Sequence, residues 1–365
     1  MSLDSYFTLG RSGLRVSPFC LGAMTFGEDF GPGGPGFGSS VEDSETILAH
    51  YLERGGNFID TANGYTRGHS EKIIGDFFRQ DKGRRDRAVI ATKFFMNLFA
   101  NDPNGGGAGR KAIVAQCEES LRRLQTDYID LYYLHNWDRF TPIEETMSAL
   151  DDLVRSGKVR YIGISDALAW KVAQAQVMAH FRGWAPLIAL QIEYSLMERT
   201  VQGELTPMAA ELGLGVLPWS PLKSGALTGK YTRANGVKMQ GLRGSRLGDL
   251  SEKQYDIIDA VGRVAAECNA DPSTVALAWL KAQPGVSSTI IGARTLQQLD
   301  ANLKALDLTL TPDQMATLND VSKPVLNFPA EFLTHSPSYS HAGATVNGVP
   351  SQRTFLVPED EIPRW

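Results

Sequence analysis

The chain has 365 residues, of which 42% are apolar and 21% charged, and its formal net charge is -5. This length fits one large α/β domain or two small ones, and the composition is that of a globular protein. The negative net charge argues against a nucleic-acid-binding protein, although a local basic site for one phosphate stays compatible with it.

The cysteines and the N-terminal residues exclude further classes of protein. Cys20, Cys117 and Cys268 lie far apart with no CxxC pair, which indicates a reducing compartment and no metal site. Residues 1–6 lack the basic and apolar segments of a signal peptide, and no apolar run approaches the roughly 18 residues of a membrane span. We therefore expect a cytoplasmic protein that is not attached to a membrane.

Short apolar runs rich in branched residues alternate along the chain with stretches of helical period. The predicted strands are residues 19–21, 58–59, 88–91, 129–134, 161–164, 187–190, 215–217 and 289–291. The predicted helices are residues 43–54, 70–78, 111–124, 143–155, 170–181, 204–212, 252–281 and 296–306. Strict alternation predicts a parallel sheet, and eight such units close into a (β/α)8 TIM barrel.

The two ends of the chain flank this repeat. Residues 6–16 predict a small hairpin that plugs the bottom of the barrel. No linker divides the core, so we expect a single domain over residues 1–365, with the barrel over about 6–320. The tail over about 325–365 contains Pro and Ser, and we expect it to lie across a barrel face.

Ionisable side chains fall at the ends of successive predicted strands. Asp60 ends the second strand, Lys93 the third and His135 the fourth, while Tyr65 follows in the loop after Asp60. In a barrel these positions share the C-terminal rim, where loops converge on one cleft. Each residue also has a purely structural alternative. Asp60 could cap the next helix and Tyr65 could be an ordinary loop aromatic. Lys93 could be a solvated strand end and His135 a hydrogen-bonded core histidine. Four such roles falling together by accident is the weaker interpretation.

These four groups together suit proton transfer to a carbonyl oxygen. An adjacent ammonium favours the ionised form of a phenol, so Lys93 is expected to lower the pKa of Tyr65. Asp60 would keep that ammonium charged, and a neutral His135 would hydrogen-bond the oxygen that gains charge. No covalent nucleophile with a paired base stands out, which favours hydride from a bound cofactor as the attacking group.

Two glycine-rich segments resemble nucleotide motifs and fail their requirements. The segment GPGGPG at 31–36 follows no strand directly, and Pro32 and Pro35 remove amide donors. The segment GALTGKY at 225–231 has one residue too few between its glycines for a P-loop. No Tyr has a Lys four residues later, which removes the Tyr-Lys pair of short-chain dehydrogenases.

Seven motifs in order resemble the aldo-keto reductases, over roughly residues 6–320. The pattern is most similar to the aryl-alcohol-dehydrogenase-like branch, which is related to the β subunits of voltage-gated potassium channels. The motifs are GNFIDTANGYTRGHSEKIIG (56–75), ATK (91–93), LYYLHNWD (131–138), GKVRYIGISD (157–166), QIEYSLMER (191–199), PWSPLKSGALTGKY (218–231) and IIGARTLQQLDANL (290–303).

The resemblance implies a TIM barrel that binds NADP(H) without a Rossmann fold, and a catalytic tetrad at Asp60, Tyr65, Lys93 and His135. Tyr65 would be the proton donor. The resemblance also implies three groups of cofactor residues: Ser165, Asp166, Gln191 and Trp219 for the nicotinamide; Ser220, Leu222, Gly225 and Lys230 for the pyrophosphate; and Gly292, Arg294, Gln298 and Asn302 for the adenosine 2'-phosphate. The structural alternative for Gln298 and Asn302 is a solvated helix face.

Asp166 departs from much of the superfamily, which has Asn at this position. An ionised Asp only accepts hydrogen bonds, so it can bind the nitrogen of the carboxamide but not its oxygen. This difference affects the expected nicotinamide geometry and not the cofactor itself.

The resemblance therefore favours NADPH-dependent reduction of an aldehyde or ketone to an alcohol. One alternative is a slow-turnover NADPH-binding sensor or partner subunit, and a weaker one is a cofactor-free barrel hydrolase or isomerase. Aromatic residues on the loops after strands one, three and four suggest an apolar substrate pocket, with pinning of the loops as the alternative: Phe30, Phe95, Phe99, Trp137 and Phe140. The sequence carries no signal for oligomeric state.

Overall fold

A parallel eight-stranded sheet forms the centre of the protein. The computed structural model describes residues 1–28, 38–233 and 248–357. All eight predicted strands are confirmed, and from β3 to β9 each strand pairs with the next strand of the chain. The strands are β3 (Phe19–Gly22), β4 (Phe58–Asp60), β5 (Val89–Phe94), β6 (Ile129–Leu134), β7 (Val159–Ser165), β8 (Leu187–Glu193), β9 (Gly215–Trp219) and β10 (Thr289–Gly292).

The sheet closes into a barrel because β10 contacts the first strand on one side and the segment before it contacts β9 on the other. The last strand, β10, pairs in parallel with the first, β3, from Thr289 opposite Phe19 onwards. On its other side a parallel bridge joins Val216 of β9 to Val286, with the Val216 amide donating to the Gly285 carbonyl at 3.0 Å. The predicted TIM barrel is therefore confirmed.

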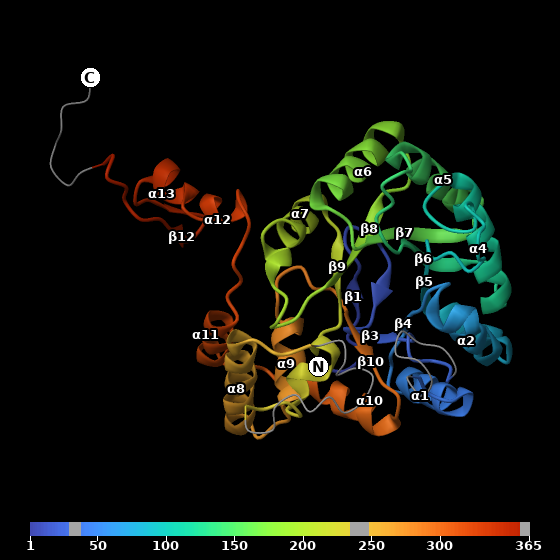
Figure 1. Cartoon of the computed structure of the whole chain (residues 1–365), viewed down its shortest axis with the longest axis horizontal. Helices are drawn as coiled ribbons and strands as arrows, with labels where there is room; N and C mark the ends of the chain where they lie inside the picture. The colour runs from blue at the N-terminus through green and yellow to red at the C-terminus, as the bar shows by residue number, and fades with distance from the viewer. Residues whose placement is uncertain (29–37, 234–247, 358–365) are drawn as a thin grey trace.

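Helices surround the strands, as Figure 1 shows. They are α1 (Val41–Glu53), α2 (His69–Arg79), α3 (Lys82–Arg87), α4 (Arg110–Leu124), α5 (Ile143–Arg155), α6 (Ala169–Arg182), α7 (Leu205–Leu212), α8 (Glu252–Glu267), α9 (Pro272–Lys281), α10 (Leu296–Leu303) and α11 (Pro312–Val321). The helix predicted over 252–281 is two helices. Asn269 has a φ of 49°, and Pro272 begins the second helix because its fixed φ suits a first helical turn.

The barrel interior is a separate small core that the N-terminal hairpin closes. β1 (Phe7–Thr8) pairs with β2 (Arg15–Val16), as predicted. Leu9, at the turn, is fully buried among interior residues of the barrel strands. Gly10 follows with a φ of 55°, and a Cβ there would meet the Ile188 carbonyl at 2.4 Å. The hairpin turn thus lies directly against the barrel wall, where no side chain fits at Gly10.

The C-terminal tail, as far as it is described (up to residue 357), does not lie across a barrel face, so the prediction was wrong for these residues. α12 (Ala330–Leu333) begins close to Gly203, whereas α13 (Ser336–His341), β11 (Thr345–Val346) and β12 (Val349–Pro350) stand away from the barrel in Figure 1. Neither α12 nor α13 contains a buried residue. These helices are too short to present a continuous apolar face, which explains why they do not pack as the barrel helices do.

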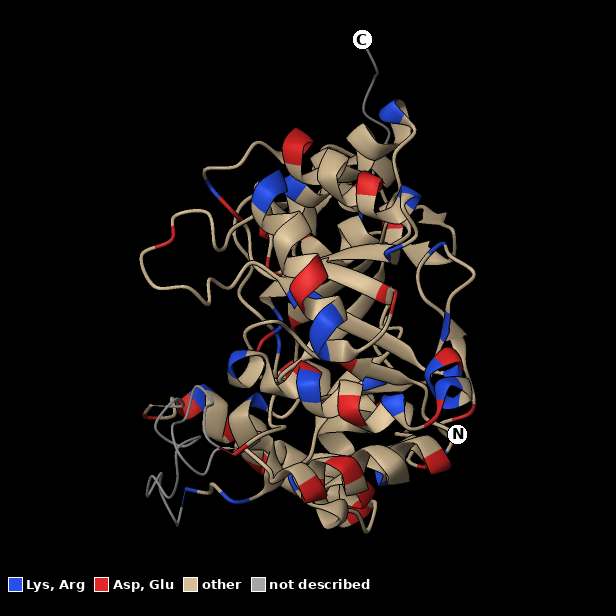
Figure 2. Ribbon diagram, turned by 90° about the vertical axis from the view of Figure 1, so that its right-hand side faces the viewer, with Lys and Arg blue, Asp and Glu red and all other residues tan. Residues whose placement is uncertain are grey.

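Charges of both signs lie on the outer helices and loops, as Figure 2 shows from the side of the barrel. The strands inside carry few of them. Within residues 1–28, 38–233 and 248–357, no helix combines the length and the apolar character needed to cross a bilayer.

We expect Leu9→Ala to lower the free energy of unfolding by about 2 to 5 kcal/mol, because it leaves a cavity in the closed barrel interior. Leu333→Ala is the matched control, since Leu333 is 53% exposed in the tail, and it should change stability by less than about 0.5 kcal/mol. Urea unfolding followed by circular dichroism measures both. Equal midpoints for the two variants would contradict a plugging role for Leu9.

Candidate active site

The four residues predicted for proton transfer lie together at the C-terminal rim. Asp60 is the last residue of β4, Lys93 lies near the end of β5, and His135 directly follows β6. Tyr65 begins a short 3-10 segment that connects β4 to α2. The parallel strands bring their carboxyl ends to one edge, so residues up to 75 positions apart in sequence share one site.

The Lys93 ammonium joins these groups. Its Nζ donates to Asp60 Oδ2 at 2.5 Å, to the Thr61 carbonyl at 2.8 Å and to the Tyr65 hydroxyl at 3.2 Å. Lys93 is fully buried and Asp60 is 2% exposed. A buried charge is tolerated only when it is paired and hydrogen-bonded, and here all three donors of the ammonium have acceptors.

Burial and charge act on the proton affinities of Tyr65 and Lys93 in opposite directions. Burial lowers the pKa of Lys93, but Asp60 and Tyr65 outweigh it and the pKa is raised, which keeps the ammonium charged. Burial raises the pKa of Tyr65 above 10, while Lys93 lowers it. The predicted influence of Lys93 is present, but the expected net decrease was wrong because burial is the larger effect. Tyr65 therefore holds its proton at neutral pH.

His135 meets Tyr65 edge to face, with ring centroids 5.7 Å apart and an interplanar angle of 80°. Burial, together with the nearby Lys93 charge, lowers the pKa of His135 to about 3. The imidazole is therefore neutral at physiological pH. Its Nδ1 is buried and has no hydrogen-bond partner among the described residues.

The residues predicted for the nicotinamide gather beside this group. Gln191, on β8, donates from Nε2 to Asp60 Oδ1 at 2.9 Å and so holds the carboxylate from across the barrel. Trp219 Nε1 donates to Asp166 Oδ1 at 3.0 Å. The buried Ser165 hydroxyl interacts with the Asp166 carboxylate. Their binding of a nicotinamide remains a prediction.

The predicted pyrophosphate residues follow β9 in a loop and a 3-10 segment (Lys223–Thr228). Four residues there have positive φ, namely Ser220, Lys223, Ser224 and Gly225. The Lys223 and Gly225 amides donate within this turn, to the Ser220 and Leu222 carbonyls, each at 2.9 Å, and the binding of a pyrophosphate there remains a prediction. A Cβ at Gly225 would meet no atom within 4 Å, so packing does not require glycine here. Glycine is favoured because the φ of this residue is 95°. Leu222 is half-buried and Lys230 is exposed.

The residues predicted for the 2'-phosphate shape the turn between β10 and α10. The Arg294 amide donates to Gln298 Oε1 at 2.9 Å, and Asn302 Nδ2 donates to the Gly292 carbonyl at 3.2 Å. Gln298 and Asn302 are therefore not a solvated face. Arg294 precedes the N-cap residue Thr295 and lies outside the helix. Its Nε is buried and has no hydrogen-bond partner among the described residues, so an oxyanion would satisfy it.

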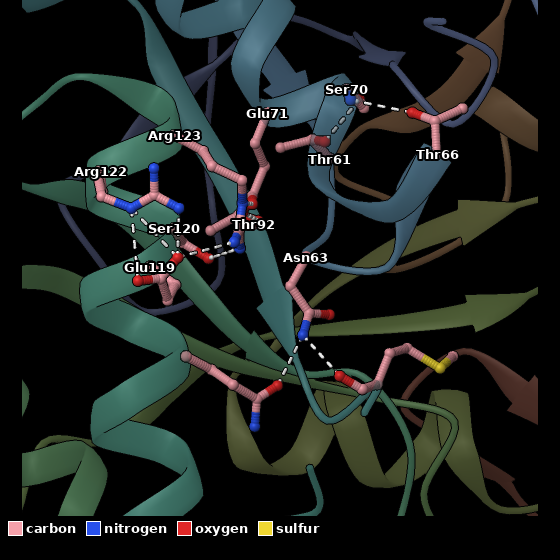
Figure 3. A network of polar contacts seen from close by, with 12 residues as sticks. Thr61, Asn63, Thr66, Ser70, Glu71, Thr92, Glu119, Ser120, Arg122 and Arg123 are labelled. Atoms are coloured by element: carbon pink, nitrogen blue, oxygen red, sulfur yellow. Dashed lines mark hydrogen bonds and ion pairs between the residues drawn. The ribbon is translucent and has the colours of Figure 1, made fainter. Parts of the chain in front are cut away.

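A polar network that the sequence did not indicate supports β5 from its outer side. Glu71, fully buried on α2, accepts from Thr92 Oγ1 at 2.5 Å and from Arg123 Nε at 2.6 Å (Figure 3). Thr92 precedes Lys93 on β5, so the network fixes the strand that carries the ammonium. An acidic residue beside Ile73 and Ile74 on a buried helix face was the available signal.

A second network, also in Figure 3, connects the loops after β4 and β5. Asn63 Nδ2 donates to Gln116 Oε1 at 2.7 Å and to the Met96 carbonyl at 2.9 Å. The same Gln116 oxygen accepts the Phe95 amide at 2.9 Å. Phe95 has a φ of 127°, which is rare for a residue with a side chain, and this hydrogen bond helps to hold it.

The aromatic residues predicted to line a substrate pocket differ in their burial, and the pocket itself remains a prediction. Phe95 and Trp137 pack against the main core, whereas Phe99 is 58% exposed and Phe140 is 95% exposed. Phe30 and the GPGGPG segment lie outside the described residues.

The fold and the site define a barrel protein with a buried acid, ammonium, phenol and neutral imidazole at its C-terminal rim. The chain belongs to the aldo/keto reductase family, whose model matches residues 18–323. It is an oxidoreductase of the aryl-alcohol-dehydrogenase-like branch.

Three relatives illustrate this similarity. The uncharacterized oxidoreductase YrpG of Bacillus subtilis is 40% identical, with 87% of this chain and 95% of that protein covered. The norsolorinic acid reductase stcV of Emericella nidulans is 35% identical, with coverages of 90% and 84%. The aryl-alcohol dehydrogenase [NADP(+)] of Phanerodontia chrysosporium is 36% identical, with coverages of 84% and 83%.

The lowered pKa of His135 predicts a loss of stability in acid. Below pH 6.5 this histidine is protonated in the unfolded chain, whereas in the folded protein it stays neutral down to about pH 3. Stability contributed by neutral His135 is therefore complete above pH 6.5 and decreases by at most about 1.4 kcal/mol per pH unit below it. His135→Asn should reduce this slope in urea unfolding between pH 7 and 4.5. The exposed His180→Asn is the control, and equal slopes for both variants would contradict a buried neutral His135.

Proposed function

We propose that this protein reduces an aldehyde or ketone to the alcohol with NADPH, and that Tyr65 is the proton donor. The observation that carries the proposal is the buried Lys93 ammonium, which donates to both Asp60 and the Tyr65 hydroxyl. A phenol that keeps its proton in the resting site, beside a cation that stabilises its anion, is suited to protonate a carbonyl oxygen.

The residues of the chain fit NADPH as the cofactor. NADPH, when bound, supplies the hydride that the carbonyl carbon accepts. Arg294 has a buried Nε without a partner among the described residues, and an oxyanion such as the 2'-phosphate would satisfy it. The printed name of the Phanerodontia chrysosporium relative includes NADP(+), which supports the same cofactor.

Each tetrad residue then has a distinct part. Tyr65 transfers its proton to the carbonyl oxygen, and Lys93 stabilises the phenolate that remains. Asp60, held by Gln191, keeps Lys93 charged and oriented. His135, neutral over the working pH range, hydrogen-bonds the carbonyl oxygen and orients the substrate.

Replacing Tyr65 with Phe should reduce kcat at least about a hundredfold, because general acid catalysis typically contributes about 10² to 10⁴. Lys93→Met should reduce it similarly, and the double variant should lose much less than the product of the two effects, since the residues act as one unit. Aldehyde-dependent NADPH oxidation measures turnover, and fluorescence quenching measures NADPH binding, which Tyr65→Phe should leave nearly unchanged.

Tyr132→Phe is the matched control, because Tyr132 is also a phenol and is fully buried on β6, but its ring packs in the main core and its hydroxyl lies 3.5 Å from the Ile113 carbonyl. This variant should keep its turnover within about threefold. An unchanged rate for Tyr65→Phe would remove Tyr65 from the mechanism. Tight NADPH binding with slow reduction of every aldehyde and ketone tested would instead favour the sensor function.

Arg294→Ala should weaken NADPH binding roughly tenfold to a hundredfold, because a hydrogen bond to a charged group contributes about 1.5 to 3 kcal/mol. NADH lacks the 2'-phosphate and should bind the variant as it binds the wild type. The preference for NADPH should also decrease as salt is added. Dissociation constants from fluorescence quenching test this, with Arg155→Ala as an exposed control. Equal weakening of both cofactors would mean that Arg294 does not contact the phosphate.

A further inference from the structure

A lysine between two indole rings lies at the catalytic rim, and the proposed proton transfer does not use it. Lys171 Nζ is 4.2 Å from the ring centroid of Trp170 and 5.2 Å from that of Trp137. Trp137 follows His135 by two residues, and Lys171 lies in the first turn of α6, five residues after Asp166. Both segments leave the C-terminal ends of neighbouring strands, β6 and β7.

The charge of Lys171 is not balanced by a nearby acid. Among the described residues, no carboxylate lies within ion-pair distance of it, whereas Lys72, Lys158 and Lys223 each pair with one. The partner of its Nζ is Gln174 Oε1, at 3.0 Å. An ammonium has three donors, so two remain available to an acceptor from outside the chain.

Helix stability does not explain a lysine at this position. A helix N-terminus carries partial positive charge and favours an acid in its first turn. The first turn of α6 contains no acidic residue, and its N-cap Leu168 makes no side-chain capping bond. The Lys171 ammonium and the N-terminus of α6 therefore form one positive region beside the candidate active site.

Exposed apolar side chains surround this positive region. Trp170 is 59% exposed and Leu168 is 54% exposed. Trp137 is half-buried against the main core, which fixes its ring, and the ammonium over the indole faces is held by cation–π attraction. A fixed cation bordered by aromatic and aliphatic surface matches a ligand that has both a flat ring and a negative charge.

We propose that Trp137, Trp170 and Lys171 form a subsite for the distal end of the substrate. It selects aromatic carbonyl compounds that carry an acidic group, either a carboxylate or an ionised phenol. Lys171 pairs with the acid, and the two indoles pack against the ring. This inference rests on the proposed carbonyl reduction for its role in turnover, but the binding of an aromatic anion at this place does not depend on that reduction.

Paired substrates that differ only in charge test the selection. The acids are 4-carboxybenzaldehyde and the longer 6-carboxy-2-naphthaldehyde, and their methyl esters are the neutral partners. For at least one pair, the wild-type kcat/KM should favour the acid about three- to tenfold, mainly through KM, and added salt should shrink the preference. Lys171→Met should abolish the preference and leave the ester within about twofold, whereas Lys171→Arg should keep it. Equal losses for acid and ester, or no preference in the wild type, would overturn the proposal.

A binding measurement separates this inference from the proposed function. Quenching of tryptophan fluorescence reports binding of 2-naphthoate and of the neutral 2-naphthamide without any turnover. The wild type should bind 2-naphthoate about three- to tenfold more tightly than Lys171→Met, and both proteins should bind 2-naphthamide alike. If none of the four aldehydes is reduced while this difference is present, the proposed function fails and the subsite stands. If reduction occurs and the naphthoate affinities are equal, the subsite fails alone.

Discussion

The buried ion pair between Lys93 and Asp60 is the constraint on which the candidate site depends. Removing an ammonium from water costs several kcal/mol, and this loss is recovered only when the geometry of its partners is good. Asp60 comes from β4, Lys93 from β5, and Gln191, which orients Asp60, from β8 on another side of the barrel. Closure of the barrel is therefore what brings these partners within hydrogen-bonding distance.

Support for β5 comes from both faces of the strand. Successive side chains of a strand point to opposite faces, so Lys93 points into the barrel while Thr92 points out toward α2 and α4. There Thr92 donates to Glu71, which also binds Arg123, and Gln116 of α4 accepts the Phe95 amide two residues beyond Lys93. These contacts with α2 and α4 fix the position of β5 in the barrel, and the position of the Lys93 ammonium follows from it.

Much of this arrangement was predictable from the sequence, for a specific physical reason. Strand and helix periods show in the local pattern, and the topology of a parallel barrel then places Asp60, Lys93 and His135 at one rim without any knowledge of their distances. Contacts between distant segments have no such local signal. Glu71 and Arg123 are 52 positions apart, and only the packing of α2 on α4 brings them together. The two-helix structure of 252–281 was a different case, because Asp271 followed by Pro272 is a local signal for a helix start. The tail prediction failed because the end of a periodic pattern does not say where the following residues pack.

The increase in the pKa of Tyr65 could also not be predicted from residue types alone, and it bears on how such a site works. A charged neighbour is visible in a sequence motif, but the extent of burial is a property of the whole fold, and here burial prevails. The two influences act on different states. Burial keeps the phenol protonated before reaction, so the proton to be donated is present. The ammonium lowers the free energy of the phenolate that forms as the proton leaves, and it does so more strongly in a buried site than it would in water. Only stabilisation that grows toward the transition state increases the rate, and the Lys93–Tyr65 contact has this character because the charge on Tyr65 develops during the reaction.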